Sequence, residues 1–225
     1  MIATHGDNSG LILPYWVAPV QVVIVPILGK KAITEEVLAN CNEVLSNLRN
    51  KSIRAELDNS DSRPGDKYYF WEMKGVPFRL EIGQREVTGS EFVVAIRDTK
   101  EKQKIPQDKL VTFLHEEGER MIERLTTKAW DAVKDLIIQT KSLEELKANI
   151  SQGKVCIIPY CSMDMEAKAC AEKLKAETEG GDVRGRLVDK PDKDLFTITK
   201  KPKSTEKCLA CGKKATLYVY IGKQY

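Results

Sequence analysis

A run of apolar, mostly β-branched residues near the start of the chain constrains the fold more than any other feature. The run, VQVVIVPI at residues 20–27, is typical of a strand in a sheet that is covered on both faces. Patterns typical of strands and helices then alternate along the chain. Strand patterns lie at 52–58, 76–83 and 91–99, and helical patterns lie at 34–48, 64–75 and 108–140. This order, β-α-β-α-β-β-α, predicts a compact α/β domain with a mixed sheet flanked by helices, and a Lys-rich loop after residue 99.

The rest of the chain has a different sequence pattern, which predicts a second, smaller α+β domain. Its expected elements are a capped helix at 142–150, a strand at 155–161 and a helix at 167–178. A segment rich in Lys and Pro follows. We expect the first domain to end near residue 120, within the long helical pattern, which then serves as the connector.

Composition and charge exclude several classes of protein. A net charge of +3 over 225 residues creates no field that would attract nucleic acid as a whole, so any such contact must come from a local patch. No apolar run approaches the roughly 20 residues that a membrane span needs, and the N-terminus has no signal-peptide core. Five of the six cysteines follow residue 155, which favours a metal site in a reducing compartment over disulfides. We therefore expect a cytoplasmic protein that does not enter a membrane.

Aromatic residues are concentrated in one stretch, PGDKYYFWEMKGVPFR at residues 64–79, which holds five of the chain's fifteen Phe, Trp and Tyr. Pro64 suits the first turn of a helix and Gly75 suits its end. If both faces of that helix were core, Lys67 and Glu72 would be buried as well. We therefore expect one set of rings to pack on the sheet and another to stand beside charged groups.

An exposed ring beside Arg79 and a carboxylate suits an unpaired nucleic-acid base. The ring stacks on the base, which contributes about 1–3 kcal/mol, and the charged groups bind its edge by hydrogen bonds. A carboxylate that accepts from guanine N1–H and N2–H₂ would make this contact specific. The alternative from composition alone is that the rings form core, with one partly exposed Tyr.

The cysteines near the C-terminus have the spacing of a metal site. Cys208 and Cys211 form a C-x-x-C pair followed by Gly212, and two further ligands must come from Cys156, Cys161 and Cys170. Four thiolates at about 2.3 Å from Zn²⁺ form a closed structural site. The alternative is a set of buried thiols without metal.

Several segments resemble prolyl-tRNA synthetases of the archaeal and eukaryotic-cytosolic type, in the family's order and over essentially the whole chain. These segments are THGDNSGLILP, VAPVQVVIVPI, PGDKYYFWEMKGVPFRLEIG, CLACGKK and YIGKQY. The resemblance implies a class II aminoacyl-tRNA synthetase, which activates proline with ATP and transfers it to its tRNA. It implies that residues 1–17 end a catalytic domain, 18–120 form a class II anticodon-binding domain and 121–225 form a zinc-bearing domain.

The resemblance also implies roles for single residues. Tyr68 takes the place of a ring that stacks on the anticodon of tRNA(Pro), and Glu72 and Arg79 take the places of groups that bind its two guanines. Lys102, in RDTKEK, matches a family Lys. For the metal, family position favours Cys161, Cys170, Cys208 and Cys211. The gap between Cys161 and Cys170 is wider than in relatives, which leaves open that Cys156 replaces one ligand or that the site is degenerate.

The catalytic core is where this chain departs from the family. The resemblance places His5, Gly6, Asp7 and Gly10 at the rim of the active site, with the catalytic Arg upstream of Met1. We therefore expect this chain to lack the catalytic domain, which binds ATP and proline. We expect the intact enzyme to form a homodimer through that domain. We expect no aminoacylation by this chain alone. The resemblance implies that Tyr225 reaches back to that active site.

Two other functions compete with this interpretation. The first is a stand-alone binding or scaffold module that keeps the fold without recognising tRNA. The second is a metal-dependent hydrolase, which is disfavoured because His5 and His115 are the only histidines. Binding to anticodon stem-loops separates the first competitor from the synthetase interpretation.

Overall fold

The computed structural model describes residues 2–28, 31–187 and 201–223. The chain divides into two compact units, residues 1–129 and residues 130–225, and each is described by itself. The boundary expected near residue 120 falls within a long helix and stays a prediction. Within the described residues, no helix combines the length and the apolar character that crossing a membrane requires.

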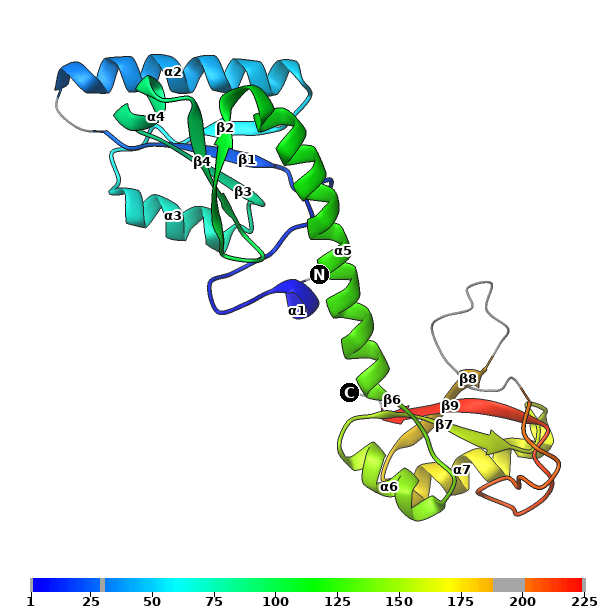
Figure 1. The fold of residues 1–225 in the computed structure, drawn as a ribbon. Helices are drawn as coiled ribbons and strands as arrows, with labels where there is room; N and C mark the ends of the chain where they lie inside the picture. Colours follow the sequence, from blue (N-terminus) through cyan, green and yellow to red (C-terminus); the bar gives the residue numbers. More distant parts are fainter. Residues whose placement is uncertain (1, 29–30, 188–200, 224–225) are drawn as a thin grey trace. The chain divides into compact units, whose positions relative to one another are not determined.

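The first unit is built on a five-stranded sheet with the order β2-β1-β3-β4-β5, in which β1 runs parallel to β2 and β3 while β3, β4 and β5 are antiparallel (Figure 1). Its strands are β1 (Val22–Pro26), β2 (Ala55–Leu57), β3 (Phe78–Ile82), β4 (Glu91–Ile96) and β5 (Lys102–Pro106). Its helices are α1 (Ile2–His5), α2 (Lys31–Asn50), α3 (Pro64–Met73), α4 (Gln84–Thr88), the 3₁₀ helix η1 (Gln107–Lys109) and α5 (Leu110–Leu136). The α/β class with a mixed sheet is thereby confirmed.

Helices cover both faces of this sheet. On one face α2 and α5 pack over the main hydrophobic core, and on the other face α3 packs over β1 (Figure 1). On the α3 side, Trp71 and Val76 form a smaller apolar cluster with Val23 and Val25. Residues Val22–Val25 are fully buried, which confirms that this strand is covered on both faces.

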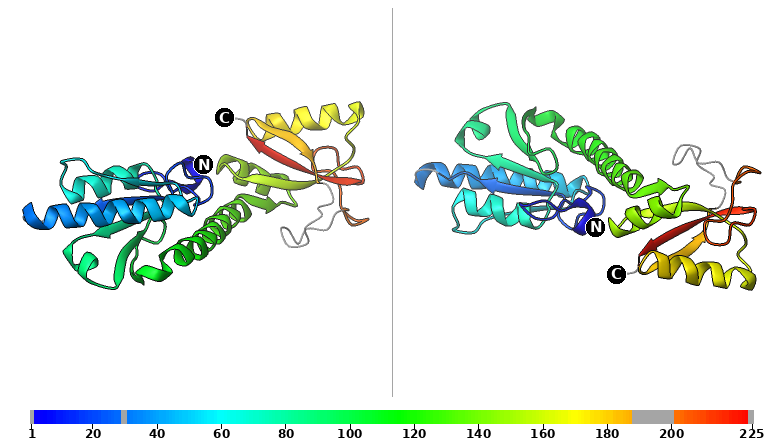
Figure 2. Two further views of the ribbon diagram at one scale, coloured as in Figure 1. Left: turned by 90° about the horizontal axis from the view of Figure 1, so that it is seen from above. Right: turned by 90° about the horizontal axis from the view of Figure 1, so that it is seen from below.

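Three local elements differ from the expectations. The Lys-rich segment after residue 99 was expected as a loop, but residues 102–106 form the edge strand β5, because Ile105 is buried while Lys102 and Lys104 remain in solvent. The helix α4 was not expected. It begins where Glu86 Oε2 accepts a hydrogen bond from the Gly83 amide. The long helix was expected to reach residue 140 but ends at Leu136, and 137–139 form a strand (Figures 1 and 2).

The second unit is built on a four-stranded mixed sheet with the order β6-β7-β9-β8. Its elements are β6 (Ile137–Gln139), α6 (Leu143–Ser151), β7 (Val155–Tyr160), the 3₁₀ helix η2 (Met165–Ala167), α7 (Lys168–Glu177), β8 (Gly181–Arg186) and β9 (Leu217–Lys223). Helices α6 and α7 pack on the sheet through Leu146, Ile150 and Leu174. The carboxyl end of β7, the helix α7 and the loop before β9 are thereby part of one core, which positions the cysteines described below.

Candidate nucleic-acid interface and cysteine cluster

The helix α3 and the strand β3 bring the residues of the aromatic stretch together. Pro64 occupies the first turn of α3, and the helix ends at Met73, after which Gly75 has a φ of +75° and turns the chain towards β3. Arg79 of β3 lies directly opposite Ala95 of β4, and Ala95 lies directly opposite Lys102 of β5, so the three residues form one row across the sheet. The side chains of this row therefore point to the face of the sheet that α3 partly covers.

Arg79 lies against the ring of Tyr68. The Arg79 Cζ is 3.9 Å from the ring centroid, and the side chain of Arg79 is only 10% exposed. Burial, together with the negative charge of Glu81, raises the pKa of Tyr68 to about 12. The Tyr68 hydroxyl is therefore protonated at neutral pH, and part of its ring surface is covered by the guanidinium.

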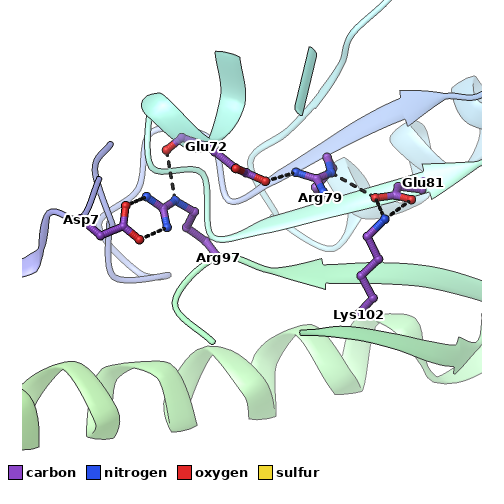
Figure 3. A network of polar contacts seen from close by, with 6 residues as sticks. All are labelled: Asp7, Glu72, Arg79, Glu81, Arg97 and Lys102. Carbon is purple, nitrogen blue, oxygen red and sulfur yellow. Dashed lines mark hydrogen bonds and ion pairs between the residues drawn. The ribbon is translucent and has the colours of Figure 1, made fainter. Parts of the chain in front are cut away.

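Charged side chains of alternating sign continue from this contact in a line (Figure 3). Arg79 Nη1 donates to Glu72 Oε1 at 2.7 Å and Arg79 Nε donates to Glu81 Oε1 at 3.2 Å, while Lys102 Nζ lies 2.8 Å from Glu81 Oε1. We call Glu72, Arg79, Glu81 and Lys102 the charge ladder. Within the described part of the chain, Arg79 Nη2 and Glu72 Oε2 take part in no hydrogen bond, so each retains capacity for an added partner.

The charge ladder borders a pocket on the open half of this sheet face. Helix α3 packs against β1, and Val93 and Ala95 of β4 remain partly exposed. Ten residues line the pocket: Val23, Trp71, Glu72, Val76, Arg79, Ala95, Ile96, Arg97, Lys100 and Lys102. Glu72 and Lys102 have side chains that are 37% and 50% exposed, so the charged rim of the pocket is open to solvent.

The structure therefore brings together all four residues expected at an anticodon site, Tyr68, Glu72, Arg79 and Lys102, although Glu72 and Arg79 bind each other. The sequence did not single out two further members of this region. The role of Glu81 was missed, although its alternation with Arg79 along β3 places both side chains on one face and could have indicated it. Arg97 gave no sequence signal, because its partners lie far away along the chain.

Lys67 was expected to stay out of the core, and this expectation was wrong. Its side chain is buried and only 3% exposed, because Asp58 supplies a partner: Lys67 Nζ donates to the Asp58 carbonyl at 2.9 Å and lies 3.7 Å from Asp58 Oδ1. Trp71 Nε1 donates to Asp58 Oδ2 at 2.7 Å. Burial raises the pKa of the Asp58 carboxyl, but hydrogen bonds from Ser60 and Trp71 outweigh it and hold the pKa below its usual value. The contacts of Asp58 with Lys67 and Trp71 therefore hold α3 against the sheet.

The segment expected at the rim of an active site lies beside α3 in the first unit. His5 ends α1, and Gly6 leads to Asp7, which binds Arg97 (Figure 3). Gly10 has a φ of +128° and lies against the backbone of Met73. Tyr225, the other residue expected to reach an active site, lies outside the described residues.

Four cysteines of the second unit form a cluster. Their Sγ atoms all lie within 4.8 Å of one another, and the Sγ atoms of Cys161 and Cys170 are 3.7 Å apart. Cys161 follows β7, Cys170 lies in α7, and Cys208 and Cys211 lie in the loop before β9. Cys156 is buried in β7 and is not part of this cluster.

The cluster fits a tetrahedral metal ion. Four thiolates at about 2.3 Å from Zn²⁺ place the sulfur atoms about 3.8 Å apart, so the cluster needs to contract only slightly. Gly212, with a φ of +73°, donates its amide to the Cys208 carbonyl at 2.9 Å and shapes the tight turn. The backbone amide of Lys213 lowers the pKa of the Cys211 thiol to about 7, whereas burial first, and the neighbouring thiols second, raise the pKa of Cys170 to about 12. These four residues could hold a metal ion.

Two family models match the chain. The model described as "Anticodon binding domain" matches residues 21–117, and the model described as "Prolyl-tRNA synthetase, C-terminal" matches residues 143–225. Together they cover most of both units.

Known proteins match over the full length of the chain. The proline–tRNA ligases of Methanosarcina mazei and Thermofilum pendens are 38% and 36% identical to it, over 100% of the chain and over 43% and 44% of those proteins. Solved structures of prolyl-tRNA synthetases from Giardia lamblia and Cryptosporidium parvum superpose with a TM-score of 0.86 each, at 30% and 36% identity, over 100% of the chain and 47% and 44% of theirs. The chain thus spans less than half the length of these relatives.

Proposed function

We propose that this chain, which belongs to the prolyl-tRNA synthetase family, recognises the anticodon of tRNA(Pro) for the ATP-dependent attachment of proline to that tRNA. The observation that carries the proposal is the position of Glu72, Arg79 and Lys102 around one pocket, with the Tyr68 ring against Arg79 and beside Lys102. The domain that holds this pocket matches an anticodon-binding model. An unpaired base needs a surface to stack on and charged groups at its edge, and the Tyr68 ring together with the charged rim of the pocket offers both.

Each residue has a distinct role in this proposal. The part of the Tyr68 ring that Arg79 does not cover stacks on a base. The free oxygen of Glu72 accepts hydrogen bonds from the Watson–Crick edge of a guanine, and the free Nη2 of Arg79 donates to the O6 or N7 of a guanine. Lys102 contributes a positive charge for the phosphate backbone. Because Arg79 already holds the Glu72 carboxylate, less side-chain freedom is lost on binding.

We infer that the cysteine cluster holds Zn²⁺ as a structural ion. Cys161, Cys170, Cys208 and Cys211 would complete its four coordination positions, which leaves none for a substrate. The ion would tie the end of β7 and the helix α7 to the loop before β9, and its binding energy would add to the folding energy of the second unit.

The activity of the whole enzyme belongs to the same proposal. The relatives are named proline–tRNA ligases, so we infer that this chain works with a catalytic domain of the same enzyme, which binds ATP and proline and through which a homodimer forms. Residues 1–17, with His5, Gly6, Asp7 and Gly10, then join that domain, followed by an anticodon-binding domain at 18–120 and a zinc-bearing domain at 121–225. Translation places the enzyme in the cytoplasm.

Binding of a fluorescent anticodon stem-loop to the 225-residue chain tests this function. We expect tight binding when the last two anticodon positions are guanines, and weaker binding by about 1–3 kcal/mol when either is replaced. Inosine is the sharpest replacement, because it lacks only the N2 amino group that Glu72 would bind. Affinity should also fall as salt concentration rises. Equal binding of an unrelated stem-loop would contradict the proposal and would favour a scaffold module.

A further inference from the structure

Arg97 joins two segments of the first unit that lie far apart in the sequence. Its Nη1 and Nη2 donate to the two carboxylate oxygens of Asp7 at 2.9 and 2.7 Å, and its Nε donates to the main-chain carbonyl of Glu72 at 3.1 Å (Figure 3). The residue follows β4 directly and is only 5% exposed. A planar guanidinium presents its donors in fixed directions, so these three bonds set the position of Asp7 relative to the Glu72 backbone.

The Asp7 side of this contact is firmly held. The carboxylate also accepts from the Ser9 amide at 2.8 Å and lies 3.3 Å from Lys100 Nζ. The Arg97 guanidinium, more than any other neighbour, keeps the pKa of Asp7 well below its usual value. The pair with Arg97 therefore remains charged throughout the neutral range.

The backbone beside Asp7 packs closely against the end of α3. The Leu11 amide donates to the Met73 carbonyl at 3.1 Å, and the Leu13 amide donates to the Gly75 carbonyl at 3.2 Å. A Cβ at Gly10 would lie 2.3 Å from Met73 Cα, and a Cβ at Gly75 would lie 2.6 Å from Leu11 Cβ. Residues 7–13 therefore brace the last turn of α3.

Glu72 lies in that last turn, where helix carbonyls lack partners within the helix. Its carbonyl accepts from the Gly75 amide at 3.0 Å and from Arg97 Nε, while its carboxylate accepts from Arg79. The backbone and the side chain of Glu72 are thus held from different directions. Removing the Arg97 bond would leave the Gly75 amide on this carbonyl and would loosen the backbone that carries the carboxylate.

We propose that Arg97, anchored by Asp7, is a positioning residue that sets the Glu72 carboxylate for guanine recognition. This inference rests on the proposed function, because it assigns Arg97 to the same pocket. Arg97 acts through Glu72 and does not itself contact the base. Its loss should therefore reduce the discrimination between guanine and inosine, because a specific hydrogen bond depends on geometry more strongly than stacking or phosphate contact does.

The test compares the stem-loop with guanines and its inosine form on the full chain and its variants. Arg97→Met keeps the apolar length and removes every donor. We expect the guanine-to-inosine ratio of dissociation constants to fall about tenfold, which corresponds to about 1.4 kcal/mol. The affinity for the inosine form should change less than about twofold. Arg97→Lys, which can replace only part of the three bonds, should give an intermediate ratio.

Arg124→Met is the matched control. Arg124 Nε and Nη2 donate to the two carboxylate oxygens of Asp98 at 2.6 and 3.0 Å, but Arg124 does not bind Glu72. Arg124 Nη2 also donates to Glu117 Oε1 at 2.8 Å. The loss of Arg124 therefore removes partly buried ion pairs from the same unit and should leave the guanine-to-inosine ratio unchanged. Thermal unfolding and circular dichroism verify that each variant is folded. If Arg97→Met does not fold, Asp7→Asn, which keeps the shape of the anchor without its charge, decides in its place.

A double-mutant cycle separates positioning from a merely structural role. In the Glu72→Gln background Arg97→Met should not reduce the ratio further, because the group it positions has already been lost. The inference would be overturned, without the proposed function, if Arg97→Met lowered the guanine-to-inosine ratio equally in both backgrounds. A folded Arg97→Met variant with the wild-type ratio would have the same consequence. A wild-type chain that does not distinguish guanine from inosine would overturn the role of Glu72 and this inference with it. Equal binding of an unrelated stem-loop would overturn the proposed function as well.

Discussion

The guanidinium of Arg79 covers one face of the Tyr68 ring, with its Cζ 3.9 Å from the ring centroid. Glu72 and Glu81 hold the same guanidinium through Nη1 and Nε. The Tyr68 ring, proposed to stack on a base, and the charged groups at its edge are therefore held together as one unit. The consequences of changing Tyr68 follow from this arrangement.

Replacing Tyr68 with Phe and with Ala should separate stacking from hydrogen bonding. Tyr68→Ala removes the ring and should weaken binding of the anticodon stem-loop by about 1–3 kcal/mol, the contribution of one stacked base. Tyr68→Phe keeps the ring and should bind within about a factor of three of the wild type. Fluorescence anisotropy titrations measure both. If Tyr68→Phe were as weak as Tyr68→Ala, the hydroxyl and not the ring face would carry the interaction.

Breaking the buried ion pair beneath α3 should destabilise the first unit strongly. Lys67→Met leaves the Asp58 carboxylate buried without its cation, which costs about 3–5 kcal/mol at buried pairs. Lys74→Met is the control, because Lys74 is exposed and loses contacts with the Phe70 and Trp71 rings, each worth about 0.5–1 kcal/mol. Urea unfolding followed by tryptophan fluorescence reports the difference. Equal stabilities of the two variants would show that the pair contributes little.

The helices and strands that follow from local sequence pattern were largely predictable, and the ion pairs that only the fold brings together were not. The run at 20–27 predicted a strand covered on both faces because apolar character alone determines that environment. Lys67 was expected in solvent because the sequence gives no sign that Asp58 lies beneath α3. Arg97 and Asp7 are 90 residues apart, and only the topology of the sheet brings them together. The segment at 102–106 contains two lysines, and pattern alone does not show that an edge strand can carry them on its solvent side.

The first unit should lose stability in acid through Asp58 and Asp7. Both carboxyls have a pKa below the usual value in the folded chain. Their stabilising effect is therefore complete above the unfolded pKa of about 3.9 and declines as pH falls through and below that value. Urea midpoints of the wild type should fall between pH 5 and pH 3, and Asp58→Asn should show a smaller fall. Asp61→Asn, at an exposed residue of the same loop, should keep the wild-type dependence, and an equal fall in all three proteins would contradict the assignment.

Metal content tests the assignment of the cysteines. The chain purified without chelator should carry about one Zn²⁺, and removal of the ion should lower the unfolding temperature of the second unit, because a structural zinc ion supplies folding energy. Mass spectrometry of the metal and differential scanning calorimetry measure the two effects. Binding should also weaken as pH falls, because thiols must lose their protons to coordinate the ion.

Two serine variants distinguish the four clustered cysteines from the fifth cysteine of this unit. Cys170→Ser removes a sulfur atom from the cluster and should lower both zinc content and stability, because three thiolates leave the tetrahedral site incomplete. Cys156→Ser alters a fully buried side chain in β7 that lies outside the cluster. It leaves all four clustered sulfur atoms in place and should therefore retain one zinc ion per folded chain. If a folded Cys156→Ser variant lost zinc while Cys170→Ser retained it, Cys156 and not Cys170 would be the zinc ligand.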